Sequence, residues 1–495
     1  MREVKLFING EFRATSRSYT STDPATNVAV AKVYLPSETD IDDAVDAAAR
    51  AFTSKEWKQL DQVKRAEILE AIAEKMKVRR NELVELEVAD SGSSVRKAKA
   101  DVQNAASYFK VLAGQLRRFQ FEVKDEAASR PGFSQNYKVY EPVGVCAQII
   151  PWNFPLVMAA WKIGPVIASG CTTVLKTAQE TPVTAGILSE ILQEVGLPPG
   201  VVNIITGGAA EGEYLLNNPK VKKVAFTGST EVGRKIMERA GKNLQRVSLE
   251  LGGKSANIVL GDADLSIAVD GALYAFLYHS GQACDSGTRL FVEEKIYPEF
   301  RDALVKRIAD VRVALPSDPS AGYGPVINQR QADRILNYIA VTKKEGGKLL
   351  YGGNRKTGAE FENGYFIEPT LFEVTPAHTI FHQEIFGPVL AITPVKDEEE
   401  AIRLANSSDY GLAGAVWSRN PQRARNVARQ LEAGTVWINE YHLLNPGMPF
   451  GGYKQSGLGR EMGEEGLKAY LEVKHLWVSD CDQRSKKPWY DVLFE

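Results

Sequence analysis

Apolar positions recur at helical spacing in the N-terminal third of the chain. The segment from Thr39 to Phe52 places its apolar residues on one face and begins with a capping pattern of Thr39 and Asp42. A second helical stretch runs from about Gln62 to Asp90. We therefore expect two long helices here, after a short β-strand start.

The centre of the chain alternates apolar runs of strand length with helical segments. The runs are KVYEPVGVCAQII, TTVLK, VVNII, VKKVAFT and RVSLEL, and helices are expected at 156–169, 184–195, 210–217 and 230–240. This alternation predicts a doubly wound parallel sheet with helices on both faces. After helical stretches at 265–280 and 301–350, the strands YFIEPTLFEV, GPVLAITPV, GLAGAVWS and GTVWINE predict a second α/β domain.

Composition and charge exclude several classes of protein. A chain of 495 residues is too long for one core, and a net charge of −2 gives no electrostatic case for nucleic acid or an anionic membrane. The uncharged run from Val143 to Trp161 is broken by Pro151, Asn153 and Pro155, so we expect a strand, a turn and a buried helix there. The first residues, MREVKLFING, lack the apolar core of a secretory signal.

The cysteines and histidines predict neither a disulfide framework nor a metal site. No CxxC pair occurs among the four cysteines, which are Cys146, Cys171, Cys284 and Cys481. The closest histidines, His378 and His382, could face one way on a helix but have no further ligand nearby in sequence. We expect no bound metal, a reducing compartment and a cytoplasmic location.

Glycine or a polar side chain follows each of the five predicted strands of the central sheet. These residues are Pro151-Trp152-Asn153, Lys176, Thr206-Gly207-Gly208, Gly228-Ser229, and Glu250 with Gly252-Gly253. Loops are commonly polar, but ligands bind beyond the carboxyl ends of parallel strands, so five such ends together favour a ligand site. The fourth end, FTGSTEVGRKI, is typical either of an anion-binding helix start or of an ordinary Ser/Thr cap.

Three residues, two at these strand ends and one in the next part of the chain, have side chains suited to carbonyl chemistry. Cys284 lies between glycines where a helix gives way to a strand, so it is either a reactive thiol or a structural cysteine. Glu250 ends its strand as a general base or as part of a solvated polar face. Asn153, within Pro-Trp-Asn-Phe-Pro, is a rigid amide donor or a turn asparagine. Asp285 should disfavour a Cys284 thiolate unless its carboxylate points away.

Six ordered motifs resemble the signatures of the aldehyde dehydrogenase superfamily across nearly the whole chain. They are PWNFP (151–155), FTGST (226–230), LELGGK (249–254), GQAC (281–284), EIFGP (384–388) and PFGGYKQSGLGRE (449–461). In detail the chain is similar to the broad-specificity, non-acylating members. The resemblance implies oxidation of an aldehyde to its acid with NAD(P)⁺ through a thioester on Cys284.

The resemblance also implies roles for individual residues. Cys284 matches the nucleophile, the Asn153 amide and the Cys284 backbone N–H match the oxyanion donors, and Glu250 matches the base that activates water. The matched cofactor-binding residues are Pro151, Trp152, Lys176, Gln179, Gly208, Gly228, Ser229, Gly252, Glu384 and Phe386. The matched substrate-channel residues are Phe154, Met158, Trp161, Leu444 and Phe450, which suit aliphatic or aromatic aldehydes.

Two positions depart from the family pattern. Gln179 stands where NAD-preferring members usually carry glutamate, and glutamine cannot repel a 2′-phosphate by charge. We therefore expect NAD⁺ as cofactor, with NADP⁺ tolerated. Ala283 stands where close relatives often carry a second cysteine, which affects the shape of the pocket and not the mechanism.

The resemblance further implies a domain division and an assembly. Residues 1–123 with 143–252 would form the NAD(P)-binding domain, 253–453 the catalytic domain, and 124–142 with 471–495 the oligomerisation element and tail of a homotetramer. Arg246, Arg460 and Glu472 match an ion-pair cluster. The tail 481–495 extends past the usual end, and its aromatics favour docking on a neighbouring subunit.

Three other functions stay open from the sequence. An acylating dehydrogenase would pass the acyl group to coenzyme A, but such members commonly lack the base matched by Glu250. A structural, crystallin-like protein would not need the catalytic residues. A hydrolase that forms a thioester without a cofactor leaves the five ligand-lined strand ends unexplained.

Overall fold

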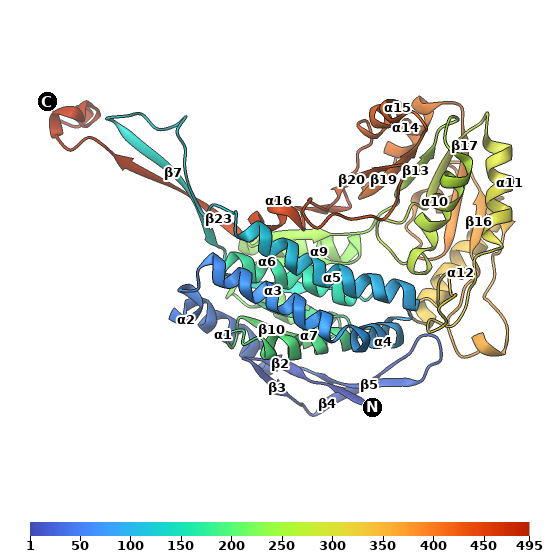
Figure 1. Ribbon diagram of the computed structural model, residues 1–495, viewed down its shortest axis with the longest axis horizontal. Coiled ribbons are helices and arrows are strands. Elements are labelled where there is room, and N and C mark those ends of the chain that lie inside the picture. The colour runs from blue at the N-terminus through green and yellow to red at the C-terminus, as the bar shows by residue number, and fades with distance from the viewer. Residues whose placement is uncertain (495) are drawn as a thin grey trace.

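Two twisted sheets with flanking helices form the body of the molecule, and a narrow hairpin projects from one end (Figure 1). The computed structural model describes residues 1–494. The first sheet has eight strands in the order β22 (Gly457–Leu458), β12 (Arg246–Glu250), β11 (Val221–Thr227), β8 (Val145–Ile149), β9 (Thr172–Thr177), β10 (Val202–Thr206), β2 (Leu6–Ile8) and β3 (Glu11–Arg13). Its five central strands are parallel, as the alternation of strands and helices predicts.

Helices cover both faces of this sheet, which confirms the doubly wound prediction. On one face α6 (Pro155–Ser169) and α7 (Val183–Glu194) pack with α3 (Gln62–Val78) and α5 (Val95–Leu116). On the other face lie α1 (Glu38–Thr53), α8 (Ala209–Asn217) and α9 (Thr230–Asn243). Apolar residues on both sides exclude water from the strands, so polar groups are left at the strand ends.

The second sheet has seven strands, of which only β15 runs antiparallel to its neighbour among the residues 1–494. The order is β15 (Lys348–Tyr351), β16 (Thr370–Glu373), β17 (Val389–Val395), β14 (Arg289–Glu293), β13 (Ala256–Val259), β19 (Ala413–Trp417) and β20 (Thr435–Ile438). Its helices are α10 (Leu265–Leu277), α11 (Tyr297–Ile308), α12 (Gln329–Lys344), α13 (Thr379–His382), α14 (Glu398–Asn406) and α15 (Pro421–Ala428). The prediction of a second α/β unit is confirmed.

Three sequence predictions were wrong in their boundaries. The run KVYEPVGVCAQII is two strands of different sheets, because Gly144 turns the chain at a φ of 120° between β7 (Ser134–Pro142) and β8. The stretch Gln62–Asp90 is two helices, α3 and α4 (Arg80–Ser91), which meet at Arg79. The first long helix is capped by Ser37 and Asp40 rather than by Thr39 and Asp42.

Two other helical predictions were too long. The stretch 265–280 is α10 followed by a short 3-10 segment, Tyr278–Gly281, in which His279 and Ser280 have left-handed backbone angles. The stretch 301–350 contains the end of α11, an irregular connection, α12 and β15. The long helix α5 has no counterpart among the sequence predictions.

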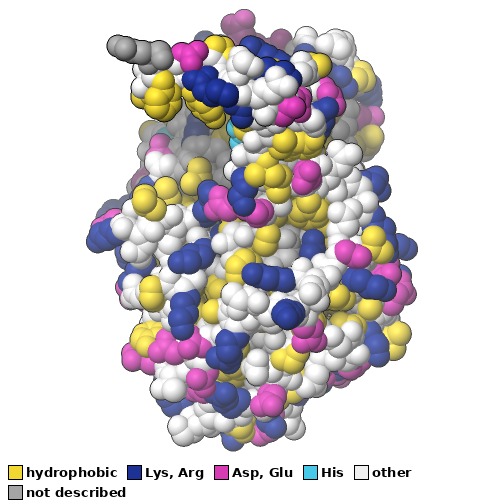
Figure 2. All heavy atoms as spheres, turned by 90° about the vertical axis from the view of Figure 1, so that its left-hand side faces the viewer, with side chains coloured by type: hydrophobic (Ala, Val, Ile, Leu, Met, Phe, Trp, Pro, Cys, Tyr) yellow, Lys and Arg dark blue, Asp and Glu magenta, His cyan; other side chains and the backbone are white. Residues whose placement is uncertain are grey.

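The projecting hairpin is built from β7 and β23 (Leu471–Ser479), with β6 (Glu122–Lys124) at its edge. The strands β7 and β23 pair without a break from Leu471–Pro142 to Ser479–Ser134. Exposed apolar side chains gather here and on the tail, which Figure 2 shows at the end facing the viewer: Val473, Leu476, Trp477, Val478, Trp489, Tyr490, Val492, Leu493 and Phe494. The tail also contacts its own chain, where Trp489 lies edge-on to Phe133 with ring centroids 5.1 Å apart.

Smaller elements complete the described chain. The strands β1 (Arg2–Val4), β5 (Ala29–Leu35) and β4 (Arg17–Thr22) form a third sheet, and β18 (Tyr410–Gly411) pairs with β21 (Tyr453–Lys454). The short helices are α2 (Lys55–Lys58) and α16 (Gly463–Lys468). No helix within residues 1–494 combines the length and the apolar character needed to cross a membrane.

Candidate active site

A cavity of about 470 Å³ receives side chains from both sheets and brings the three chemically suited residues together. Asn153 and Glu250 reach it from the carboxyl ends of β8 and β12, and Cys284 reaches it from the turn between α10 and β14. Predicted cofactor residues also line it: Pro151, Trp152, Gly228, Ser229, Gly252, Glu384 and Phe386. The sequence indicated the strand ends, and the fold gathers them at one crevice.

Cys284 differs from the other cysteines because it is only partly buried. Cys146, Cys171 and Cys481 are buried, whereas Cys284 opens onto the cavity. The backbone of Gly253 packs tightly against that of Cys284, since a Cβ on Gly253 would lie 2.1 Å from the Cys284 carbonyl oxygen. Burial raises the pKa of the Cys284 thiol well above its usual value, and the negative charges of Asp285, Glu384 and Glu250 raise it further. These surroundings therefore favour the thiol over the thiolate.

Asn153 lies in the rigid turn that connects β8 to α6. Pro155 occupies the first turn of α6, where its missing N–H leaves no helical bond unmade. The Asn153 side chain is 4% exposed and donates one N–H to the Gln282 carbonyl oxygen at 2.8 Å. This bond ties the turn to the segment just before Cys284. A primary amide has two N–H donors, so one remains for another acceptor.

Glu250 is a buried carboxyl group with no hydrogen-bond partner among the residues 1–494. Its Oε1 would be only 2.7 Å from a Cβ on Gly451, so the glycine makes room for the carboxylate. Burial raises the pKa of Glu250 well above its usual value, and the nearby Glu461 raises it further. A solvated polar face is thereby excluded, and a raised pKa suits a base that works near neutral pH.

A buried ion pair lies behind Glu250. The Lys162 ammonium pairs with Glu461 and donates to Thr227 Oγ1 at 2.7 Å, and both charged side chains are almost fully buried. The positive charges of Lys162 and Arg460 oppose the rise in the pKa of Glu250. Lys162 and Glu461 are 299 positions apart, so the sequence pattern gave no signal that they meet.

A second cavity, of about 590 Å³, continues from the first along the sheet edge and shares Ile149 and Phe226 with it. Apolar side chains of α8 and α9, among them Leu216, Val232 and Ile236, line it together with charged side chains of the same helices, and Lys176 and Gly208 also contribute. Burial lowers the pKa of Lys176 to about 8, and its ammonium donates to the Gly207 carbonyl oxygen at 2.5 Å.

The lining of the second cavity leaves little space for added side chains. A Cβ on Gly212 would lie 3.3 Å from Lys176 Cε, and one on Gly208 would lie 3.1 Å from Gln179 Oε1. A lining that combines apolar side chains, a buried lysine and close-packed glycines fits the adenosine half of a dinucleotide.

Between the two cavities, the start of α9 supplies unpaired backbone donors. Ser229 caps this helix by accepting from the Val232 N–H at 3.4 Å, and its side chain lines the first cavity. The cap interpretation of this motif is confirmed, and the anion-binding interpretation stays a prediction. The N–H groups of the first turn that the Ser229 cap leaves free suit a pyrophosphate.

Glu384 and Phe386 close the crevice from the second sheet. Glu384 accepts from the Gly253 N–H at 3.0 Å, and a Cβ on Gly252 would lie 2.5 Å from its Oε2. Phe386 has a φ of 63° and stands edge-on to Trp152 with ring centroids 5.3 Å apart. This backbone conformation is rare for residues other than glycine, which indicates that the surrounding structure fixes the position of the Phe386 ring.

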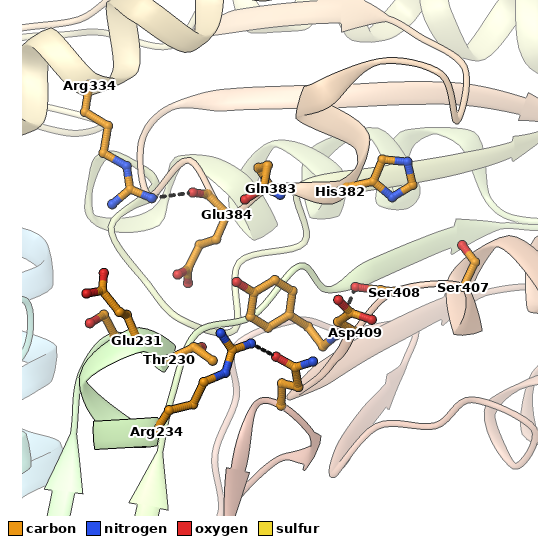
Figure 3. Close-up of a pocket in the computed structure, with 13 residues that line it drawn as sticks. Thr230, Glu231, Arg234, Arg334, His382, Gln383, Glu384, Ser407, Ser408 and Asp409 are labelled. Carbon is orange, nitrogen blue, oxygen red and sulfur yellow. Dashed lines mark hydrogen bonds between the residues drawn. The ribbon is translucent and has the colours of Figure 1, made fainter. Parts of the chain in front are cut away.

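A third cavity, of about 540 Å³ and strongly polar, adjoins this crevice (Figure 3). It shares Ser229, Arg334 and Glu384 with the first cavity. Arg234 from α9 and Arg334 from α12 approach it from opposite sides, and Arg334 donates to the Glu384 carbonyl oxygen at 2.7 Å. Cys284 is not among its lining residues, so this space lies apart from the thiol.

The predicted substrate-channel residues do not all lie together. Phe154 and Met158 line the first cavity, and Trp161 packs against Phe450 with ring centroids 5.6 Å apart in the same apolar cluster as Met158. Leu444 is 37% exposed on the loop before Phe450 and does not line the cavity. The predicted ion-pair cluster is also incomplete: Arg246 pairs with Glu472, but Arg460 donates to the carbonyl oxygens of Gly452 and Gly459.

Sequence reasoning missed the contribution of α12. Arg330, Gln331 and Arg334 line the cavity, and Gln331 donates to the Phe386 carbonyl oxygen at 2.7 Å. Polar residues on an amphipathic helix are ordinarily solvated, so nothing in the local pattern distinguishes these from surface residues.

Comparison with known proteins agrees with the fold and the motifs. The sequence model of the aldehyde dehydrogenase family matches residues 12–476. A mitochondrial aldehyde dehydrogenase of Sus scrofa is 43% identical over 481 residues, 96% of this chain and 91% of the relative. The NAD⁺ complex of an aldehyde dehydrogenase from Bacillus cereus superposes with a TM-score of 0.93 at 42% identity, covering 97% of each chain. A betaine aldehyde dehydrogenase from Staphylococcus aureus in complex with NAD⁺ gives 0.94 at 38% identity, covering 97% of this chain and 96% of that one.

Proposed function

The chain belongs to the aldehyde dehydrogenase family, and from this we propose that the crevice around Cys284 is its active site. The enzyme oxidises an aldehyde to the carboxylic acid with NAD⁺. The observation that carries the assignment is one cavity lined by the Cys284 thiol, the Asn153 amide and an unpartnered, buried Glu250 carboxyl group.

We propose the following roles for these residues. Cys284 Sγ attacks the aldehyde carbon, and the thiol proton leaves the site. The oxygen of the resulting thiohemiacetal accepts hydrogen bonds from the Asn153 amide and the Cys284 backbone N–H. When bound, NAD⁺ would supply the acceptor for the hydride and a positive charge that favours the thiolate. Cys284 would then carry an acyl thioester. Glu250 then takes a proton from water, the hydroxide attacks the thioester carbon, and the acid leaves with Cys284 restored.

We propose that NAD⁺ lies along the strand ends. The adenosine would occupy the cavity beside Lys176 and Gly208, and the pyrophosphate would lie at Ser229. The nicotinamide ribose and ring would lie near Glu384 and Phe386. Gln179, close to Gly208, carries no charge against a 2′-phosphate, so we propose that NADP⁺ is also accepted.

Apolar aliphatic or aromatic aldehydes are the proposed substrates. Phe154 and Met158 line the cavity beside Cys284, and the packed rings of Trp161 and Phe450 belong to the same apolar cluster as Met158. Such apolar surroundings favour these groups over sugar phosphates. A steady-state panel of hexanal, benzaldehyde, betaine aldehyde and glyceraldehyde 3-phosphate, each with NAD⁺ and NADP⁺, tests this. A higher kcat/KM for either charged aldehyde than for hexanal and benzaldehyde would reject the assignment.

An acylating reaction is the second candidate. The buried Glu250 next to Cys284 argues against it, because a water-activating base diverts the thioester to the acid. Product analysis with and without coenzyme A separates the two functions. Formation of an acyl-coenzyme A product would favour the second.

We further propose a cytoplasmic homotetramer, with 1–123 and 143–252 as the cofactor domain and 253–453 as the catalytic domain. The support is the apolar face of the β7–β23 hairpin and of the tail, which exposes Trp477, Leu493 and Phe494. In this proposal 124–142 and 471–495 form the contacts between subunits. Removing residues 482–495 should weaken the assembly in analytical ultracentrifugation, and an unchanged mass and unchanged kinetics would reject a role for the tail.

A further inference from the structure

Asp285 directly follows the proposed nucleophile, where a free carboxylate would oppose formation of the thiolate. Its charge is one of the causes that raise the pKa of Cys284. The Asp285 side chain is about 10% exposed and points to His442, whose Nδ1 lies 3.2 Å from Asp285 Oδ2. The loop that carries His442 lies 157 positions further along the chain.

Both ring nitrogens of His442 face hydrogen-bond acceptors. Nδ1 faces the Asp285 carboxylate, and Nε2 lies 3.1 Å from the Ala275 carbonyl oxygen. A neutral imidazole has one N–H and can satisfy only one of these acceptors, whereas an imidazolium satisfies both. With only 4% of the His442 side chain exposed, water has little access to replace the missing bond.

The same geometry allows the proton to lie on Asp285 instead, and the pair has no net charge in either arrangement. A protonated Asp285 would donate to Nδ1, and Nε2–H would still donate to Ala275. Only loss of the shared proton leaves a net negative charge beside Cys284. After that loss the His442 ring has a single N–H, so it can donate to Asp285 or to the Ala275 carbonyl oxygen but not to both.

The surroundings of His442 hold it in place without offering another charged partner. Aromatic rings from three elements pack around it: Tyr274 and Tyr278 from α10 and its extension, Trp437 from β20, and the adjacent Tyr441. The packed tyrosines are uncharged, and the other carboxylates that act on Tyr274 are bound elsewhere: Glu440 accepts from the Tyr441 N–H, and Asp101 pairs with Lys97. Tyr441 in turn donates to the Asp285 carbonyl oxygen at 2.8 Å.

The backbone of His442 also indicates a specified position. Its φ is 61°, in the left-handed region that residues other than glycine rarely adopt. The ring reaches Asp285 and Ala275 from this conformation.

We propose that His442 is a positioning residue that shares one proton with Asp285, so that the Asp285–His442 pair beside Cys284 has no net charge. This inference rests on the proposed role of Cys284 as the nucleophile. The thiolate then forms next to a neutral pair and not next to a bare carboxylate.

The test compares alkylation of Cys284 by iodoacetamide in four proteins: wild type, His442→Gln, Asp285→Asn and the double variant. Alkylation reports the thiolate, and peptide mapping confirms the residue that reacts. Loss of the compensating proton should raise the thiol pKa by about one unit, so His442→Gln should react about tenfold more slowly at pH 7. In the Asp285→Asn background, where no carboxylate remains, the same substitution should change the rate less than twofold.

An equal loss in both backgrounds would overturn the proposal, since it would show that His442 acts only on the structure of the loop. So would an unchanged rate in His442→Gln. The pH dependence of kcat/KM gives a second readout. A purely structural defect would lower kcat/KM at every pH without moving the pH–rate profile along the pH axis. Failure of the proposed function is separately visible, because a Cys284→Ala variant would then still oxidise aldehyde.

Discussion

Asn153→Ala tests the proposed oxyanion site, because it removes an amide donor from the cavity wall and adds no new group. One N–H of Asn153 is bound to the Gln282 carbonyl oxygen at 2.8 Å, which leaves the other available to the substrate oxygen. Loss of one preorganised donor of this kind typically reduces kcat by about 10²–10³, or about 2.7–4 kcal/mol of barrier. We expect a decrease in this range with a smaller change in KM.

The same substitution has a structural effect that must be separated from the catalytic one. It leaves the buried Gln282 carbonyl without this donor, which costs about 1–3 kcal/mol of stability. Asn203 is a matched control, since its buried side chain donates to the carbonyl oxygens of Thr173 and Gly200 but does not line the Cys284 cavity. Asn203→Ala should lower the melting temperature comparably and retain most of kcat.

Alkylation of Cys284 supplies the second control for Asn153→Ala. Iodoacetamide reacts at a carbon that carries no developing oxyanion, so its rate should change less than threefold while kcat falls. A decrease in kcat of less than about fivefold would refute the oxyanion role. A parallel loss of alkylation would show that the substitution displaces the nucleophile.

Three further substitutions test separate parts of the account. Gly253→Ala places a Cβ 2.1 Å from the Cys284 carbonyl oxygen, so the nucleophile must shift, and kcat should fall at least tenfold; wild-type turnover would contradict the packing. Gln179→Glu should raise the ratio of kcat/KM with NAD⁺ to that with NADP⁺, and an unchanged ratio would remove this residue from cofactor choice. Burial raises the pKa of Glu87 from 4.5 to about 8, so the folded chain keeps a proton that the unfolded chain releases. The free energy of unfolding therefore falls as the pH rises between these two values. Urea unfolding of Glu87→Gln should therefore show little change at pH 4.5 and a clear gain at pH 8.5, whereas equal effects at both would contradict this assignment.

Much of the fold could be predicted because the central strands alternate regularly with helices, and both faces of the sheet are buried. The strand ends at Asn153, Lys176 and Glu250 could be identified for the same reason, since parallel strands bring their carboxyl ends to one edge. The error at 138–150 arose because a continuous apolar pattern does not reveal that Gly144 sends its two halves to different sheets.

The groups that modify the reactive residues could not be predicted. Lys162 meets Glu461, and Asp285 meets His442, across 299 and 157 positions respectively. Such pairs depend on how the two sheets and the loop before Phe450 pack, and no local periodicity records that. Asp285 illustrates the limit, since the sequence indicated a charge conflict beside Cys284 but not the group that relieves it.

The central claim is that an acyl thioester forms on Cys284 and that Glu250 is needed to hydrolyse it. A Glu250→Gln variant keeps the shape of the side chain and removes the base. Mixed with hexanal and NAD⁺, it should release about one equivalent of NADH per active site and then nearly stop. Intact-protein mass spectrometry should show one added acyl group, and peptide mapping should place it on Cys284. Steady turnover at the wild-type rate, or a burst without an adduct on Cys284, would contradict the account.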